Sequence, residues 1–187
     1  MIKLVNSLLN VSRIDMGTLS VNPKPTHLFK LADAALDEAL LTDIKHLKII
    51  KRYKRLPKIK VDPQLMDIVF QNIISNAVKY SREHGQIVIS MGKNKDNVLI
   101  AIQDFGYGIP KEQQPKIFTK LFRADNIKTR KVEGTGLGLY VAKSVIEAFG
   151  GKIWFTSEEN KGTTFFISLP LKGAKKISGS RSLEGNT

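Results

Sequence analysis

Residues 62–80 read DPQLMDIVFQNIISNAVKY, and this stretch predicts the central helix of the molecule. Asp62 directly precedes Pro63, and a capping side chain followed by proline at the first helical position is typical of a helix start. Apolar residues then recur at a spacing of three and four, which favours a helix with one face packed in a core. Asn72 and Asn76 lie four residues apart, so they share one face of this helix.

The chain around this helix alternates between helical and strand patterns. Residues 28–44 predict a helix rich in Leu and Ala, and residues 138–149 predict another that ends at a glycine pair. Strands are expected at residues 47–53, 58–61, 86–91, 98–103, 152–157 and 164–169. Together they predict an α/β two-layer sandwich, in which a mixed, mostly antiparallel sheet of about five strands is covered on one face by about three helices.

Four stretches depart from this pattern. Residues 1–20 predict a helix that Gly17 stops, either folded back onto its own domain or the stub of a longer helix that pairs elsewhere. Residues 22–25 contain two prolines, which predicts a linker. Residues 105–135 are rich in Gly, Pro and Lys and are too long for an ordinary connection, so we expect a long lid there, mobile without a ligand. The stretch from 172 to 187 lacks periodicity and predicts a disordered tail, whose end has the composition of an appended non-native sequence.

Composition bounds the class of protein. The chain has 187 residues, a net charge of +13, 42% hydrophobic residues and no cysteine, which predicts one globular domain with appendages and excludes disulfides and thiolate metal sites. It shows neither an apolar run near the roughly 20 residues that span a bilayer nor the pattern of a signal peptide. We therefore expect this fragment to be soluble and cytoplasmic.

Positive charge is concentrated in residues 45–60 and 111–133. Such clusters are either solvated surface or sites that attract a polyanion. The first cluster leaves open a basic binding module for nucleic acid or an anionic membrane surface, but Tyr53 is its only aromatic residue, so base stacking is poorly supported and nucleic acid is not the expected partner.

The shared face of the central helix carries Asn72, Asn76, Lys79 and Tyr80. Amide oxygens suit Mg²⁺, which prefers hard oxygen ligands, and an ammonium group suits a phosphate oxygen. The alternative is that the two asparagines are ordinary surface polar residues.

Two glycine-containing stretches add to this chemistry. Asp104 ends a strand and enters a turn with Gly106 and Gly108, where a carboxylate can accept a hydrogen bond from the exocyclic amine of adenine or can simply cap the turn. Gly134, Gly136 and Gly138 precede a predicted helix, and such a loop either presents N–H groups to an anion or acts as a hinge.

These features belong to four motifs in a fixed order: Gln71–Tyr80, Asp104–Pro110, Ile117–Arg123 and Glu133–Leu139. The set resembles the N, G1, F and G2 boxes of the catalytic ATP-binding domain of sensor histidine kinases. That family shares a superfamily with type II topoisomerases, mismatch-repair ATPases and heat-shock chaperones. The resemblance covers residues 22–171, which would form this domain, with residues 172–187 as its tail.

The resemblance implies ATP and Mg²⁺ as cofactors. Asn72 and Lys79 would act in catalysis, Asn76 would hold Mg²⁺, and Asp104 would bind the adenine amino group. The nucleotide would contact residues from all four motifs and one further strand: Asn72, Asn76, Lys79, Tyr80, Asp104, Gly106, Gly108, Ile109, Phe118, Phe122, Arg123, Gly134, Thr135, Gly136, Leu137, Gly138, Leu139 and Thr163.

The phosphoacceptor of that family has no match here. None of the three histidines, His27, His46 and His84, lies in a His-Glu or His-Asp-Leu-Arg-Thr-Pro motif. Residues 1–21 resemble instead the end of the second helix of the dimerisation and phosphotransfer hairpin. We therefore expect a kinase half, truncated before its acceptor histidine and monomeric, from a homodimeric parent that can be anchored in the cell membrane.

The expected reaction is transfer of the γ-phosphoryl group of ATP to a histidine on the separate dimerisation domain, for signalling to a response regulator. Asn72 stands where the hydrolases of the superfamily have a glutamate general base, and an amide cannot take a proton from water. A serine kinase or a hydrolase of the same superfamily remains the alternative.

Overall fold

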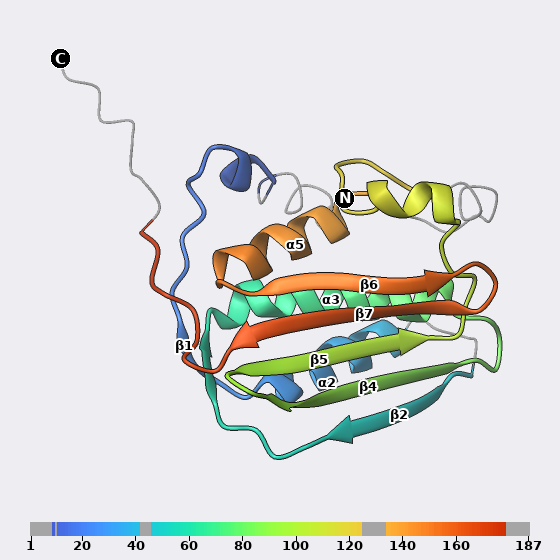
Figure 1. The fold of residues 1–187 in the computed structure, drawn as a ribbon, viewed down its shortest axis with the longest axis horizontal. Coiled ribbons are helices and arrows are strands. Elements are labelled where there is room, and N and C mark those ends of the chain that lie inside the picture. The colour runs from blue at the N-terminus through green and yellow to red at the C-terminus, as the bar shows by residue number, and fades with distance from the viewer. Residues whose placement is uncertain (1–8, 10, 42–45, 125–133, 179–187) are drawn as a thin grey trace.

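The computed structural model describes residues 9, 11–41, 46–124 and 134–178. Its main sheet has five strands in the order β2-β4-β5-β7-β6 (Figure 1). These are β2 (Lys48–Tyr53), β4 (Gln86–Asn94), β5 (Asn97–Asp104), β7 (Gly162–Pro170) and β6 (Lys152–Glu158). Strands β2 and β4 run parallel and the other neighbours run antiparallel.

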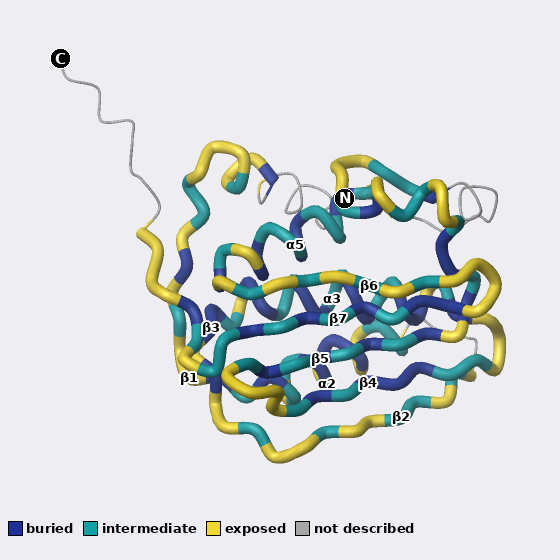
Figure 2. The backbone as a smooth tube through the Cα atoms, viewed as in Figure 1, coloured by how far each residue is buried: buried dark blue, intermediate teal, exposed yellow. Residues whose placement is uncertain are grey.

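Three helices cover one face of this sheet: α2 (Leu28–Leu40), α3 (Pro63–Tyr80) and α5 (Gly138–Ala148). Helix α3 is the middle one and packs against both others and against β5. Figure 2 shows buried residues concentrated along α3 and the central strands, while β2 at the sheet edge is half-buried or exposed. The predicted two-layer α/β sandwich is therefore confirmed.

The start of α3 is fixed by its predicted cap. Asp62 Oδ1 accepts hydrogen bonds from the Gln64 and Leu65 backbone N–H groups at 3.0 and 3.3 Å. Its other oxygen, Oδ2, accepts from the Asn22 backbone N–H at 2.9 Å. One carboxylate thus satisfies first-turn donors, as capping requires, and also ties down the entry to the domain.

The hairpin of β4 and β5 is longer than predicted. We expected strands at residues 86–91 and 98–103, but the ladder continues until Asn94 faces Asn97. The alternation of buried residues stops earlier than the backbone pairing, because Lys93 and Asn94 lie beyond the core and are exposed. Hydrophobic periodicity reports burial, so it underestimates strands that extend into solvent.

The linker prediction for residues 22–25 is wrong in part. Residues Lys24–Thr26 form β1, which pairs antiparallel with β3 (Ile59–Val61) in a small second sheet. Pro25 is tolerated because the strand has a single partner, and proline is compatible with an edge strand.

The start of the predicted tail is also ordered. The Ala174 N–H donates to the Lys60 carbonyl at 2.7 Å, and Val21 and Ile177 exchange backbone hydrogen bonds of 2.9 and 3.1 Å. The described residues 172–178 therefore extend the folded unit, which corrects our boundary at 171. Residues 179–187 lie outside the described residues.

The remaining expectations fall near gaps in the description. Helix α2 ends at Leu40, short of the predicted residue 44, and residues 42–45 lie outside the described residues. Residues 11–15 are helical, and Gly17 ends that turn with a φ of 65°, as predicted. In the expected lid a 3₁₀ helix, η1, spans Lys111–Lys116. Residues 125–133 lie outside the description, so the predicted mobility of the lid stays a prediction.

Candidate functional site

A hollow of about 140 Å³ opens between α3, the start of α5 and the ends of β5 and β7. Its walls combine amide, hydroxyl, charged, glycine and apolar groups from segments far apart in sequence. The lining residues are Asn72, Ser75, Asn76, Lys79, Tyr80, Asp104, Gly108, Ile109, Ile117, Phe122, Arg123, Ala124, Gly134, Thr135, Gly136, Gly138, Leu139, Thr163 and Phe165.

The hollow brings together nearly all of the residues predicted for the nucleotide site. The exceptions are Gly106, Phe118 and Leu137, which do not line the hollow. Our sequence analysis missed Ser75, Ile117, Ala124 and Phe165. Ile117 and Ala124 lie within or beside the third motif, and Ser75 lies within the first. Their closeness to a motif was the only indication in the sequence that they belong to the site.

Asp104 is a buried carboxylate at the end of β5. Its Oδ1 accepts hydrogen bonds from the backbone N–H groups of Gly106 at 3.0 Å and of Thr163 at 3.3 Å. Burial raises the pKa of Asp104 to about 6, although these backbone hydrogen bonds oppose the rise. Two backbone donors thus hold Oδ1, and the carboxylate lines the hollow, where it suits an exocyclic amine.

Ser157 supports this end of the hollow and was missed from the sequence. Its Oγ lies 2.9 Å from Thr163 Oγ1 and accepts the Ile109 backbone N–H at 2.9 Å. Gln114 Nε2 donates to the carbonyls of both Ile109 and Ser157 at 3.0 Å. These contacts fix the loop after Asp104 against the β6–β7 hairpin. Ser157 and Gln114 lie in ordinary strand and loop sequences, so no local sequence pattern predicts their role.

The turn after Asp104 requires glycine at position 106, because a side chain there would clash with α3. A Cβ at this position would lie 1.9 Å from the Tyr80 carbonyl oxygen. The next residue, Tyr107, donates its backbone N–H to that same oxygen at 3.2 Å. The turn therefore packs directly on the end of α3, which joins the second motif to the first.

The two amides of α3 occupy different surroundings. Asn72 Nδ2 donates to the Ile68 carbonyl at 2.9 Å, which orients its Oδ1 toward the start of α5. A Cβ at Gly138 would lie 2.4 Å from that Oδ1, so only glycine leaves room for the amide. Asn76 lines the hollow one turn further along. Within the described ranges no group of three His, Cys, Asp or Glu residues could hold a metal ion.

Cationic groups lie at the side of the hollow near Tyr80. Burial raises the pKa of the Tyr80 hydroxyl, and the charge of Arg123 partly opposes that rise. A Cβ at Gly134 would lie 3.9 Å from Arg123 Nε and 4.0 Å from Tyr80 Oη. Lys79 is exposed and also lines the hollow. This side can neutralise an anion, whereas Asp104 favours a donor.

Aromatic residues build the apolar wall. Phe118 packs edge-on against Phe155 and Phe165, with ring centroids 5.9 and 6.5 Å apart. Phe165 faces the hollow together with Ile109 and Phe122. Phe118 thus holds the third motif to the sheet without lining the hollow, and Leu137 likewise is buried as the residue that precedes α5. Such a wall suits the flat face of a base.

Part of the basic cluster predicted for residues 45–60 lies on β2, at the edge of the main sheet. Lys51 of β2 forms an ion pair of 2.7 Å with Asp33 of α2. Lys48, Lys51 and Arg52 of this cluster lie on the edge strand β2, where cations discourage pairing with other chains. No helix among the described residues is long and apolar enough to cross a membrane.

Comparison with known proteins tests the resemblance of the four motifs. The family model described as histidine kinase-, DNA gyrase B- and HSP90-like ATPase matches residues 61–173. The sensor histidine kinase WalK of Bacillus subtilis (strain 168) is 38% identical over 175 residues, which cover 92% of this chain and 29% of WalK. The sensor protein kinase WalK of Staphylococcus aureus is 37% identical over 182 residues, covering 92% of this chain and 42% of that protein. The chain therefore spans less than half the length of these curated relatives.

Solved structures agree. The nucleotide-free catalytic domain of the histidine kinase ThkA superposes with a TM-score of 0.66 at 25% identity, covering 82% of this chain and 97% of that domain. The mycobacterial sensor histidine kinase MprB shares the fold, with a TM-score of 0.71 at 23% identity over 80% of this chain and 98% of that one. The chain thus belongs to the family of histidine kinase-, DNA gyrase B- and HSP90-like ATPases, and it carries the ATP-binding catalytic domain of the sensor histidine kinases.

Proposed function

We propose that this domain binds ATP with Mg²⁺ and transfers the γ-phosphoryl group to a histidine on the dimerisation domain of a longer parent kinase. The observation that carries the proposal is the polarity of the hollow. A buried carboxylate, Asp104, lies on one side, while Lys79, Arg123 and the glycine loop before α5 lie on another. A nucleoside triphosphate has the matching arrangement, with an amine-bearing base and an anionic chain.

The base would lie near the end of β5. Asp104 Oδ2 would accept from the adenine amino group while Gly106 and Thr163 hold Oδ1. The rings would face the apolar wall of Ile109 and Phe165. A base that carries a carbonyl oxygen in place of this amine would bring an acceptor to an acceptor, so the geometry selects adenine over guanine.

The phosphates would extend toward α5. Gly134, Thr135 and Gly136 lead into this helix of 11 residues, whose first N–H groups and dipole favour an anion. Lys79 and Arg123 would offset the remaining phosphate charge. Asn76 would hold Mg²⁺ together with phosphate oxygens and water, a ligand set that the ion prefers. When bound, Mg²⁺ would neutralise charge that develops on the transferring group.

Asn72 would position the site without acting as a base. Its amide is fixed by the Ile68 carbonyl and lies against Gly138, and it cannot remove a proton from water. This arrangement supports phosphoryl transfer by positioning and electrostatics in preference to hydrolysis. Tyr80 and Leu139 would complete the walls around the ribose and phosphates.

The partners follow from this chemistry. The transferred group needs an acceptor histidine from the dimerisation hairpin, and the phosphorylated histidine would serve a response regulator. We infer that the parent is a homodimer through that hairpin and is anchored in the cell membrane, while this domain acts in the cytoplasm.

Calorimetric titration tests the proposed ligand. We expect ATP and ADP to bind in the micromolar range with Mg²⁺, and we expect GTP to bind far more weakly because Asp104 selects the amine. Equal affinity for ATP and GTP would contradict the proposed base site. Absence of any binding of ATP would contradict the function itself.

A further inference from the structure

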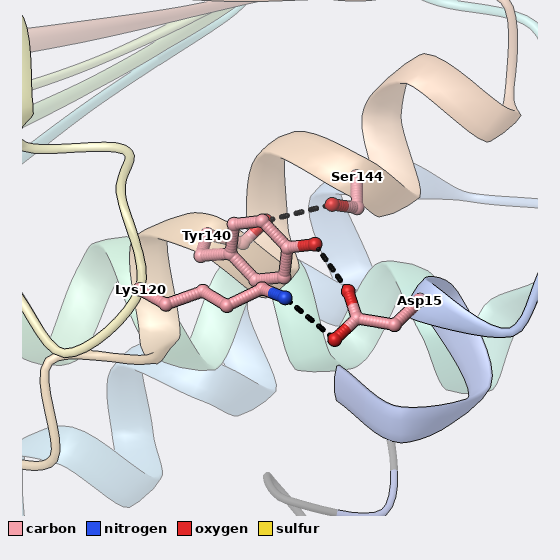
Figure 3. Close-up of polar contacts among 4 residues, drawn as sticks. All are labelled: Asp15, Lys120, Tyr140 and Ser144. Atoms are coloured by element: carbon pink, nitrogen blue, oxygen red, sulfur yellow. Dashed lines mark hydrogen bonds and ion pairs between the residues drawn. The ribbon is translucent and has the colours of Figure 1, made fainter.

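The carboxylate of Asp15 joins three segments that are distant in sequence. Figure 3 shows it facing both the Lys120 ammonium group and the Tyr140 hydroxyl. Lys120 Nζ lies 2.5 Å from Asp15 Oδ2, and the Tyr140 hydroxyl donates to Asp15 Oδ1 at 2.8 Å. Lys120 Nζ also lies 4.9 Å from the centroid of the Tyr140 ring. Both oxygens of the carboxylate are therefore engaged, each by a different segment.

Both of these segments contribute residues to the walls of the nucleotide hollow. Lys120 belongs to residues 117–124, of which Ile117, Phe122, Arg123 and Ala124 line the hollow. Tyr140 lies in the first turn of α5 and directly follows Gly138 and Leu139, which also line it. Lys120 and Tyr140 are not among the lining residues, so Asp15 connects the two walls from the outside.

The position of Asp15 in its own segment is unfavourable for helix stability. It is the last residue of the helical stretch 11–15, just before the turn at Gly17. A negative charge at the C-terminal end of a helix interacts unfavourably with the helix dipole. The contacts with Lys120 and Tyr140 offset that cost, so a carboxylate here serves the tertiary contact and not the helix.

We infer that Asp15 is a positioning residue for the nucleotide site, which clamps residues 117–124 to α5 and lets the N-terminal segment control how firmly nucleotide is held. This inference rests on the proposed function. We call the three residues Asp15, Lys120 and Tyr140 the clamp.

The electrostatics of the clamp agree with this role. The hydrogen bond from Lys120 lowers the pKa of Asp15, and the same bond raises the pKa of Lys120, so both stay charged at neutral pH. Both side chains are partly exposed, at 40 and 42%. An exposed ion pair is weak and is screened by salt, which suits a contact that forms and breaks reversibly.

Thermodynamic linkage makes the effect reciprocal. If the clamp holds the walls in the arrangement that binds nucleotide, then bound nucleotide must stabilise the clamp by the same factor. Movement of the segment that carries Asp15 would thereby change nucleotide affinity, and nucleotide would change the order of residues 11–17. The N-terminal segment acts in this way as a control element outside residues 61–173, the part that the family model matches.

The chain offers a matched control for the test. Asp33 Oδ1 accepts the Tyr53 hydroxyl at 2.9 Å and lies 2.7 Å from Lys51 Nζ. It is the same carboxylate–lysine–tyrosine chemistry between α2 and β2, but none of its three residues lines the hollow. Asp33→Asn therefore removes an equivalent contact without touching the site.

Hydrogen exchange of the whole chain, measured without nucleotide at low salt, decides whether the clamp exists. Asp15→Asn is expected to raise the exchange rate of residues 117–124 by about two- to fivefold, the range of an exposed ion pair, whereas Asp33→Asn leaves those residues unchanged. The difference should shrink at 1 M salt. Unchanged exchange in Asp15→Asn, or equal effects of both variants, would overturn the inference.

The second measurement is the dissociation rate of Mg-ADP. Asp15→Asn is expected to raise it by about two- to fivefold, and Tyr140→Phe in that background should add little, because the shared carboxylate is already gone. An unchanged rate in Asp15→Asn would overturn control of nucleotide binding. If the wild-type chain bound no nucleotide, the proposed function would fail, while the exchange comparison would still decide the clamp.

Discussion

Asp104 concentrates the recognition of the base in one side chain. Its Oδ1 accepts from two backbone donors, and in the proposed complex Oδ2 accepts from the amino group of the base. Asp104→Asn can place its own amide hydrogen where an acceptor is required. An unmet buried donor costs about 1–3 kcal/mol, so we expect ATP affinity to fall by roughly 5- to 150-fold. Calorimetry measures this loss, and an affinity equal to that of the wild type would contradict the role of Asp104.

The same carboxylate predicts a dependence of folding stability on pH. Burial raises the pKa of Asp104 from 3.8 to about 6, so between these values the folded state binds more protons than the unfolded state. The contribution of Asp104 to stability is therefore fully present below about pH 4 and is lost as pH rises through 6. Asn has no proton to lose.

Urea unfolding of nucleotide-free protein tests this sign. The stability of the wild type relative to Asp104→Asn should be greater at pH 4.5 than at pH 7.5, by about 1–3 kcal/mol. Other titrating groups cancel in the comparison. A relative stability that rises with pH would show that Asp104 is stabilised as the charged form, contrary to the expectation.

At the scale of elements, a substitution where α3 meets α5 should change nucleotide affinity more than folding stability. Gly138→Ala would place a Cβ 2.4 Å from Asn72 Oδ1, at the end of a side chain that can move. Alanine favours a helix over glycine by about 1 kcal/mol, so the folded state should lose little stability. The displaced amide should nevertheless weaken Mg-ATP binding, roughly tenfold if one hydrogen bond to the ligand is lost.

A double variant isolates this cause. In an Asn72→Ala background no amide remains to be displaced, so Gly138→Ala should have little further effect on Mg-ATP affinity. Calorimetry of the wild type, the two single variants and the double variant gives the coupling free energy between the two positions. A loss of the same size in both backgrounds would assign the effect to the helix backbone and not to Asn72.

The elements also show why part of the fold was predictable. The start of α3 depends on adjacent residues, Asp62 and Pro63, and its face repeats within a few turns, so local sequence contains the answer. Strand β1 exists only because residues 24–26 meet residues 59–61, and the chain near Ala174 then joins Lys60. No local pattern encodes such pairings, and proline argued against the strand.

The residues of the site also fall into two groups, those that the local sequence predicts and those that it does not. Its motif residues are compact in sequence and could be assigned from resemblance, whereas Ser157 and Phe165 are ordinary strand residues that gain their place from register. Lys120 illustrates the limit most clearly. The sequence placed it in the basic cluster of residues 111–133, but in the structure it pairs with Asp15 and does not line the hollow. Charge composition cannot tell which anion a lysine will meet.

At the scale of the whole molecule, the domain lacks a suitable acceptor for the group that we propose it transfers. His27, His46 and His84 all lie in the described residues, and none lines the hollow. His46 and His84 stack on each other with ring centroids 5.8 Å apart, at the loops before β2 and after α3. Fast transfer requires an acceptor held in line with the breaking bond.

Incubation with labelled ATP should therefore leave the isolated chain without acid-labile phosphohistidine. Adding a separate dimerisation hairpin that contains the acceptor should restore labelling weakly, because the effective concentration that a covalent tether provides is lost. Asn76→Ala should abolish the restored signal if Asn76 holds Mg²⁺, whereas the control Asp33→Asn should retain it. Strong labelling of His27, His46 or His84 in the isolated chain would contradict the proposal that the acceptor lies on another domain, since one of these loops would then have to reach the bound phosphate.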